Sequence, residues 1–231
     1  LVEAMKIRLK IYGKRHPNVG ASFANKGVLH WNMGDFDKAL EYYHQSMQIR
    51  KAVFGENHRR VASSYENMAG VFKERKELDK ALWHTQKALE IRQSIWKGNH
   101  PDLAVSYKNL SSLYHLKEET QTALQYLAKA EKMWGDIYGF NHPTTAAILD
   151  SKGKMYSDLK QSSKALSYFR KALEIRQSIF GQNHPATADS YAALGKMYQI
   201  LAQSDSAKYH LQQAISIRIY LQERDHFQLM N

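Results

Sequence analysis

The chain lacks cysteine and is poor in proline and glycine, with four and twelve of these residues among 231. The absence of cysteine excludes a disulfide framework, a thiolate metal site and a cysteine nucleophile. The scarcity of proline and glycine excludes collagen-like and linker-like chains. No apolar run reaches the roughly 18 to 20 residues of a membrane-spanning helix, and residues 1–15 lack the apolar core of a signal peptide. We therefore expect a cytoplasmic protein with no membrane partner.

The net charge is +11, from 33 basic and 22 acidic side chains. Such an excess attracts nucleic acids, anionic membrane surfaces or acidic peptides. It is spread thinly, because residues 1–57, 58–99, 100–141 and 142–231 carry +4, +4, −1 and +4. No run of five like charges is present. The charge is therefore a general bias and does not mark a binding patch.

Histidine recurs every 42 residues, at His16, His58, His100, His142, His184 and His226. A constant period of this length is typical of repeat architectures. Proline follows four of these histidines, at Pro17, Pro101, Pro143 and Pro185. The chain is thus expected to be one solenoid: a truncated repeat at 1–15, five repeats at 16–57, 58–99, 100–141, 142–183 and 184–225, and the start of a further repeat at 226–231.

Each repeat is predicted to form two helices. The first opens at the His-Pro step, because proline suits the first helical turn. The second follows a short polar turn such as 33–35 and ends at a glycine, as at Gly55, Gly139 and Gly181. Alanine marks the close approach of the two helices in every repeat, at Ala39, Ala81, Ala123, Ala165 and Ala207. One helix pair cannot bury its apolar faces alone, so the pairs must stack.

The repeats resemble the tetratricopeptide repeat. The residues that carry the resemblance are Tyr191-x2-Leu194-Gly195-x2-Tyr198 and Ala165-x3-Phe169. The length of 42 residues and the Ala-Leu-Glu-Ile-Arg segments at 88–92 and 172–176 are similar to the kinesin light chain type. The resemblance implies an all-α fold, a right-handed superhelical solenoid of antiparallel helix pairs. It also implies a non-catalytic scaffold that binds extended, acidic peptide segments in a concave groove, as kinesin light chains bind cargo.

In this family a recurring asparagine on the first helix holds the peptide backbone, and its position here is occupied by Asn25, Asn67 and Asn109. One amide offers a donor and an acceptor, which match a peptide C=O and N–H together. The fourth and fifth repeats depart from this pattern, with Ser151 and Ala193. The same face carries Lys73, Lys108, Lys154 and Lys196, which would attract an acidic partner. These seven residues are our candidate peptide-binding site, and Trp31 is expected to pack or to line the groove.

The histidine series does not predict a metal site, because equivalent atoms of stacked repeats lie on the order of 10 Å apart and zinc needs ligands near 2 Å. We expect these histidines to cap helices and pack loops. No phosphate-binding loop and no nucleophile motif is present. We therefore expect no enzymatic activity, no catalytic residue, no metal and no cofactor.

Two other functions remain open. One is a helical-repeat RNA-binding module, which the charge permits. The arginines that share one column of the second helix, Arg8, Arg50, Arg92, Arg176 and Arg218, are expected on its outer face as partners of salt bridges between repeats. The other is a self-stacking array, since Leu211, Ile215, Ile217 and Leu221 are expected to be exposed on the final helix and would allow end-to-end association. Nucleic acid is the less expected partner.

Overall fold

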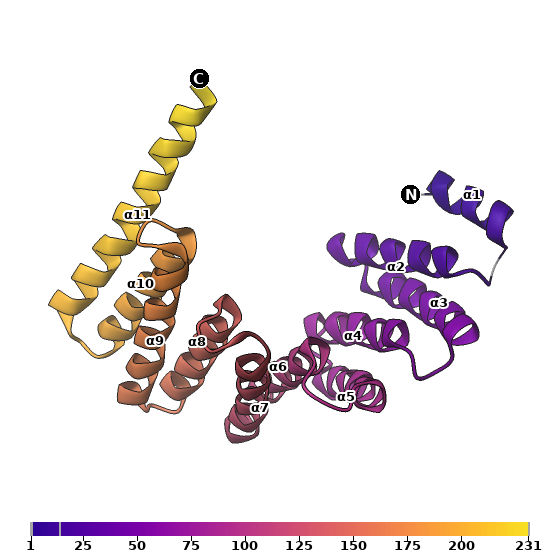
Figure 1. Cartoon of the computed structure of the whole chain (residues 1–231), viewed down its shortest axis with the longest axis horizontal. Helices are drawn as coiled ribbons and strands as arrows, with labels where there is room; N and C mark the ends of the chain where they lie inside the picture. Colours follow the sequence, from indigo (N-terminus) through magenta and orange to yellow (C-terminus); the bar gives the residue numbers. More distant parts are fainter. Residues whose placement is uncertain (1, 14, 231) are drawn as a thin grey trace. The chain divides into compact units, whose positions relative to one another are not determined.

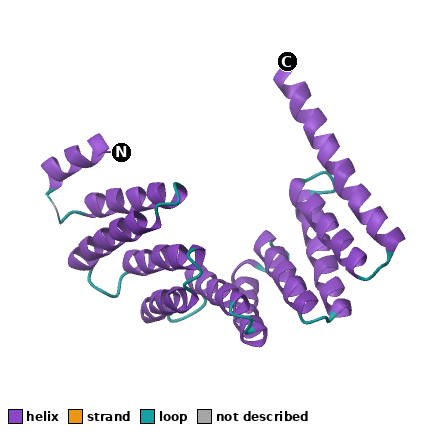
Figure 2. Ribbon diagram, turned by 180° about the vertical axis from the view of Figure 1, so that it is seen from behind, coloured by secondary structure: helices purple, strands orange, loops and turns teal. Residues whose placement is uncertain are grey.

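The computed structural model describes the backbone of residues 2–13 and 15–230, and the side chains of residues 7–13 and 15–224. Within these ranges the chain consists of helices and short connections (Figure 2). The helices, labelled in Figure 1, are α1 (Val2–Tyr12), α2 (Pro17–Asn32), α3 (Phe36–Phe54), α4 (Arg59–Glu74), α5 (Leu78–Ile95), α6 (Pro101–Leu116), α7 (Thr120–Tyr138), α8 (Pro143–Asp158), α9 (Ser162–Phe180), α10 (Pro185–Ile200) and α11 (Ser204–Met230). The fold is all-α, as predicted.

The helices pack as consecutive antiparallel pairs. Within a repeat, α2 packs against α3, α4 against α5, α8 against α9 and α10 against α11. The second helix of one repeat then packs against the first helix of the next, as α3 does against α4, α5 against α6 and α9 against α10. We call each such contact between successive repeats a junction. The chain divides into two compact units, Leu1–Tyr126 and Leu127–Asn231.

The period of 42 is reproduced in the helix starts. The first helices begin at residues 17, 59, 101, 143 and 185. Alanines with no exposed surface, such as Ala39, Ala81 and Ala165, lie where the two helices of a repeat meet. A larger side chain there would force the pair apart. Gly55, Gly139 and Gly181 follow their helices with φ near +80°, a conformation that favours glycine.

The turn inside each repeat also needs a left-handed residue. Gly34 supplies it in the first repeat with φ of 76°. Non-glycine residues supply it in the others, at Lys76, Glu118, Lys160 and Ala202. These residues adopt a conformation that costs about 1 kcal/mol for a side chain with a Cβ.

The last helix differs from the expected boundary. A new repeat was predicted from residue 226, but α11 continues to Met230. The stop signals of the earlier repeats are missing, because Glu223 stands in the glycine column and Phe227 in the proline column. The side chain of His226 lies outside the described residues.

Candidate functional site

The periodic histidines cap the first helices. The Nδ1 atom of each ring accepts the backbone N–H two residues later at 3.1 to 3.2 Å, from His16, His58, His100, His142 and His184. An Nδ1 that accepts must be unprotonated. Burial and the neighbouring charges of Arg59 and Arg60 lower the pKa of His58, which favours this state. The predicted capping role is confirmed for these five histidines.

An aromatic ring covers each capping histidine, which the sequence analysis did not identify. The stacked pairs are Tyr12–His16, Phe54–His58, Trp96–His100, Tyr138–His142 and Phe180–His184, with ring centroids 3.8 to 5.0 Å apart. The signal was present as a second column of period 42, four residues before the histidine. The end of each second helix is therefore packed against the cap of the next helix.

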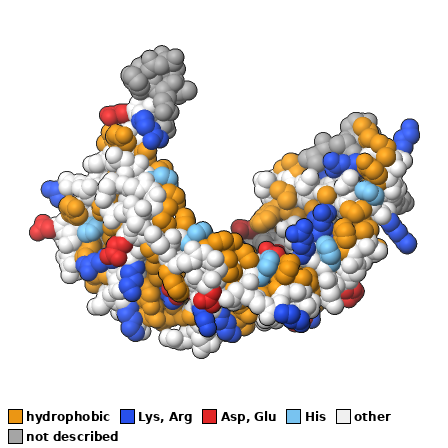
Figure 3. All heavy atoms as spheres, in the orientation of Figure 1, with side chains coloured by type: hydrophobic (Ala, Val, Ile, Leu, Met, Phe, Trp, Pro, Cys, Tyr) orange, Lys and Arg blue, Asp and Glu red, His pale blue; other side chains and the backbone are white. Residues whose placement is uncertain are grey.

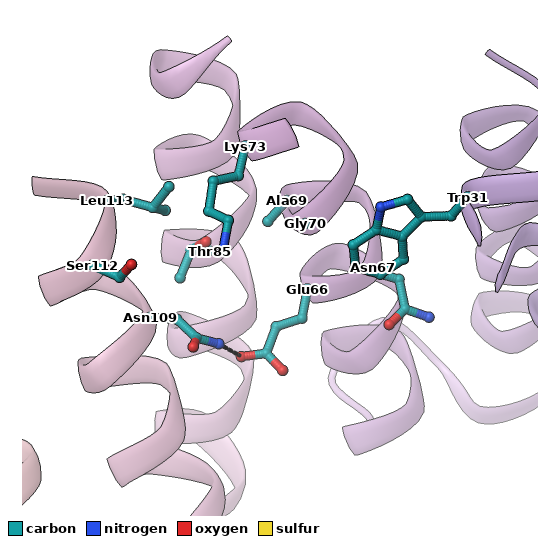
Figure 4. A pocket seen from close by; sticks show the side chains of 10 residues that line it. All are labelled: Trp31, Glu66, Asn67, Ala69, Gly70, Lys73, Thr85, Asn109, Ser112 and Leu113. Carbon is teal, nitrogen blue, oxygen red and sulfur yellow. Dashed lines mark hydrogen bonds between the residues drawn. The ribbon is translucent and has the colours of Figure 1, made fainter. Parts of the chain in front are cut away.

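The first unit contains a groove formed by side chains of α2, α4, α5 and α6, with a volume of about 280 Å³ (Figure 4). We call it the amide groove. Its lining residues are Trp31, Glu66, Asn67, Ala69, Gly70, Lys73, Thr85, Asn109, Ser112 and Leu113. Three of the predicted site residues thus line one groove: Asn67, Lys73 and Asn109.

Small side chains keep the amide groove open. Thr85 occupies the column that holds Tyr43 in the first repeat and Phe169 in the fourth. In the first repeat the Tyr43 ring fills this space, because a Cβ at Gly27 would lie only 2.5 Å from it. In the second repeat Ala69 and Thr85 replace that glycine and tyrosine, so less volume is filled. A small residue in this column was therefore a signal for the groove that the sequence analysis missed.

A hydrogen-bonded chain positions Asn109. Its Nδ2 donates to Glu66 Oε1 at 3.1 Å, as the dashed line in Figure 4 shows. Glu66 in turn accepts two bonds from Arg92 at 2.5 and 2.7 Å, and Arg92 also donates to Ser106 at 2.5 Å. The Arg92 side chain is only 6% exposed. This arrangement orients the Asn109 amide and leaves its oxygen and second N–H for a ligand.

Trp31 of α2 and Lys73 of α4 also line the amide groove. The Trp31 ring lies against Gly70, where an added Cβ would be 2.9 Å from it. It also packs on the buried cluster that contains Tyr43 and Met68. Trp31 thus both packs and lines the groove, the two roles considered for it.

Asn25 and Lys108 do not line the amide groove. Asn25 is exposed on α2 and Lys108 is exposed on α6. They keep their place in the predicted columns, but the structure does not bring them together with Asn67, Lys73 and Asn109.

The second unit contains a different groove, of about 370 Å³, between α8, α9, α10 and α11. We call it the cationic groove. Its floor is apolar, with Phe169 and Met197 buried. Its charged lining residues are Lys154, Lys196 and Arg218 with Asp158 and Asp189, and Arg218 pairs with Asp189 at 3.0 Å. Lys154 and Lys196 are therefore brought together, in a groove without the asparagine column.

Four arginines of the column connect their helix to the next repeat. Arg8, Arg50, Arg92 and Arg176 each donate to a serine of the next first helix, at Ser22, Ser64, Ser106 and Ser190. Arg176 also donates to Asp150 at 2.6 Å. Burial raises the pKa of Asp150 in spite of this arginine. The ion pairs of Arg92, Arg176 and Arg218 each lie within one repeat, so the expected salt bridges between repeats are not found, and the serine hydrogen bonds make that connection instead. The predicted outer position is wrong for Arg92, which is buried between packed helices, whereas Arg218 is 60% exposed.

Basic side chains are scattered over the visible face in Figure 3, with apolar and acidic side chains between them. The Arg92 guanidinium is buried in the junction and cannot contribute to a phosphate track. No described residue supports the RNA-binding alternative over the peptide groove. Among the residues described, no group of three or more His, Asp or Glu side chains could hold a metal.

The expectation for α11 is partly wrong. Ile215 is 56% exposed, but Ile217 is 5% exposed and packs with Ala188 and Tyr191. Leu211 and Leu221 are half-buried. Helical spacing places residues 215 and 217 on opposite sides, so they could not both be exposed.

None of the helices in the described ranges is long and apolar enough to cross a membrane.

These features, helix pairs in tandem with small residues at the crossing point, define an all-α repeat protein. A family model described as tetratricopeptide repeat matches residues 21–94, 61–136 and 144–219. The chain belongs to the tetratricopeptide repeat family. No curated protein matches the sequence.

Solved structures of kinesin light chain-like repeat proteins are similar to this fold. BtubC (BKLC) from P. vanneervenii has a TM-score of 0.82 at 20% identity, over 96% of this chain and 88% of that chain. The putative kinesin light chain repeats of Podospora anserina have a TM-score of 0.76 at 19% identity, over 90% and 98%. MamA has a TM-score of 0.56 at 18% identity, over 86% and 91%. These likenesses concern the fold, and tetratricopeptide repeats generally serve as scaffolds that bind peptides.

Proposed function

We propose that this protein is a non-catalytic scaffold of the cytoplasm that binds extended, acidic segments of partner proteins, as a kinesin light chain binds cargo. The observation that carries the proposal is the amide groove, in which Asn67 and Asn109 lie beside Trp31 and Lys73. Amides at successive repeats match the regularly spaced C=O and N–H groups of an extended backbone. Trp31 offers apolar contact area for a side chain of the peptide.

Charge supports the acidic character of the ligand. Lys73 lines the amide groove, while Lys154 and Lys196 lie on the rim of the cationic groove. Glu66 does not oppose an acidic ligand strongly, because Arg92 neutralises it. Lysines at a rim speed association more than they increase affinity.

The test uses an array of short acidic peptides that each contain one apolar residue. Hits of the wild-type protein are measured again with Asn67→Ala/Asn109→Ala and, as a matched control, with Asn25→Ala, which changes the same column outside the groove. We expect the double variant to bind at least tenfold more weakly and the control to bind within twofold of wild type. Equal loss in both variants, or unchanged binding in the double variant, would overturn the groove assignment.

A further inference from the structure

A cluster of three aromatic rings recurs inside the repeats. One ring of the second helix contacts two rings of the first helix in four of the five repeats. The clusters are Phe23, His30 and Tyr42; Tyr65, Phe72 and His84; Tyr107, Tyr114 and Tyr126; and Tyr191, Tyr198 and His210, with centroid distances of 5.0 to 6.3 Å. Offset and tilted rings at such distances stabilise one another. The third ring is thus a regular part of the repeat.

The fourth repeat lacks one ring. Tyr156 and Tyr168 stack at 5.3 Å, but Leu149 stands where the other repeats have Phe23, Tyr65, Tyr107 and Tyr191. A cavity of about 550 Å³, the junction cavity, opens at this place between α7, α8 and α9. Leu149 and Tyr168 both lie in its wall. The position of the missing ring and the position of the cavity coincide.

The neighbouring column has changed as well. At the α5–α6 and α9–α10 junctions a glutamine bonds to the tyrosine hydroxyl, Gln93 to Tyr107 at 3.2 Å and Gln177 to Tyr191 at 3.0 Å. Gly135 occupies the glutamine column at the α7–α8 junction. The ring of Phe140 lies over this glycine, where a Cβ would be 2.3 Å from it, and is 60% exposed at the edge of the cavity. An aromatic side chain so exposed is typical of a contact surface.

We propose that the junction cavity binds an aromatic side chain of a partner protein, which supplies the ring that the fourth repeat lacks. The chain itself shows which group fits, because a phenol ring fills the equivalent place at Tyr107 and Tyr191. Two exposed charged side chains that line the cavity, Lys171 and Glu174, carry opposite charges, which suits flanking residues of both signs. The ligand therefore differs from the acidic segment proposed for the grooves.

This site is separate from the cationic groove. Leu149 and Lys154 are five residues apart on α8, and at about 100° per residue they point roughly 140° apart. The two lining sets share no residue. A partner at the junction cavity thus leaves the groove side of α8 accessible.

The experiment titrates N-acetyl-L-tyrosinamide into ¹⁵N- and methyl-labelled protein and follows the NMR spectra. We expect saturable shifts at residues 131–152 and 168–175 with a dissociation constant on the order of 1 mM, as for a ligand of this size. Nuclear Overhauser contacts should join the probe ring to the methyl groups of Leu149. In the Leu149→Tyr variant the new tyrosine ring occupies the junction cavity, so the affinity for the probe should fall at least tenfold.

Ser167→Tyr is the matched control, because it adds the same side chain at an exposed column where Trp83 and Tyr209 already occur. Its affinity for the probe should stay within twofold of wild type. The absence of saturable shifts in the wild type would overturn the proposal. Saturable binding without contacts to Leu149 would also overturn it, and this second reading does not depend on the folding of the Leu149→Tyr variant.

Discussion

Two regions with the same repeat pattern are held together differently. At the junction of α5 and α6, Arg92 joins Glu66 and Ser106, and Gln93 joins Tyr107. At the junction of α7 and α8 the same columns hold Trp134, Ile148, Gly135 and Leu149. An ion pair of Lys152 and Glu131 lies there instead, in columns that are apolar in the second and fifth repeats. The backbone geometry of a repeat therefore fixes where contacts occur but not their chemistry, and the altered junction is where a cavity opens.

The largest loss of stability is expected when the polar contacts of the α5–α6 junction are removed. Arg92→Ala leaves the Glu66 carboxylate, whose side chain is 18% exposed, without its partner. We expect the free energy of unfolding to fall by about 3 kcal/mol or more, because an uncompensated buried charge remains. Urea unfolding followed by circular dichroism measures the change. Arg218→Ala is the control, since its ion pair is exposed and should contribute less than about 1 kcal/mol; similar losses in both variants would contradict the distinction.

A smaller effect is expected at the other junction. Lys152→Leu leaves Glu131, 22% exposed, unpaired, and should cost about 2 kcal/mol of unfolding free energy. The double variant Glu131→Leu/Lys152→Leu reproduces the apolar residues of Leu89 and Leu110 in these columns and should return to within about 1 kcal/mol of wild type. The same urea experiment decides. A double variant as unstable as the single one would show that this junction needs its ion pair.

We expect the aromatic clusters of the second and fourth repeats to differ in their response to pH. Burial lowers the pKa of His84 to about 4, whereas Tyr168 occupies this column in the fourth repeat. A lowered histidine pKa stabilises the fold above the unfolded value near 6.5, and this stability is lost as the pH falls toward 4. Because solvent still reaches part of the ring, we expect a loss of about 1 kcal/mol between pH 7.5 and pH 5. His84→Tyr should remove it, and an unchanged pH dependence of urea unfolding in that variant would assign the loss to other groups.

The smallest difference concerns the caps, which the two regions share. His100 and His142 each accept a backbone N–H at 3.1 Å. His100→Ala and His142→Ala should each cost about 1 kcal/mol of unfolding free energy, the usual contribution of an N-cap. The two losses should agree within about 0.5 kcal/mol. If only one of the two variants lost stability, the contribution of the histidine cap would depend on the chemistry of its junction.

The sequence predicted the fold closely because the period of 42 is strong and local. His-Pro starts, alanine crossings and glycine ends recur often enough to locate the helices. It did not predict the end of α11, since the expected boundary rested on His226 without its proline and glycine signals. It also placed Arg92 on the outer face. A recurring charged residue in the sequence does not show whether hydrogen-bond acceptors lie between the two packed helices.

The candidate site was predictable in part. Columns of period 42 placed Asn67, Lys73 and Asn109 on one face, and the three line one groove, while their role in peptide binding stays a prediction. They could not exclude Asn25 and Lys108, because a cavity depends on the volumes of facing side chains. The groove volume depends on Thr85 being smaller than Tyr43, the residue in the same column of the first repeat. This signal appears only when the facing columns of both helices are compared between repeats.

The central claim, that a peptide backbone is held by the amides of the groove, is tested most directly by the side-chain Nδ2 resonances of Asn67 and Asn109. An acidic peptide selected on the array is added to ¹⁵N-labelled protein until binding is complete. The account predicts that both side-chain amides shift and become protected from solvent exchange, while that of Asn25 does not. Saturated binding that leaves the Asn67 and Asn109 amides unchanged would contradict it.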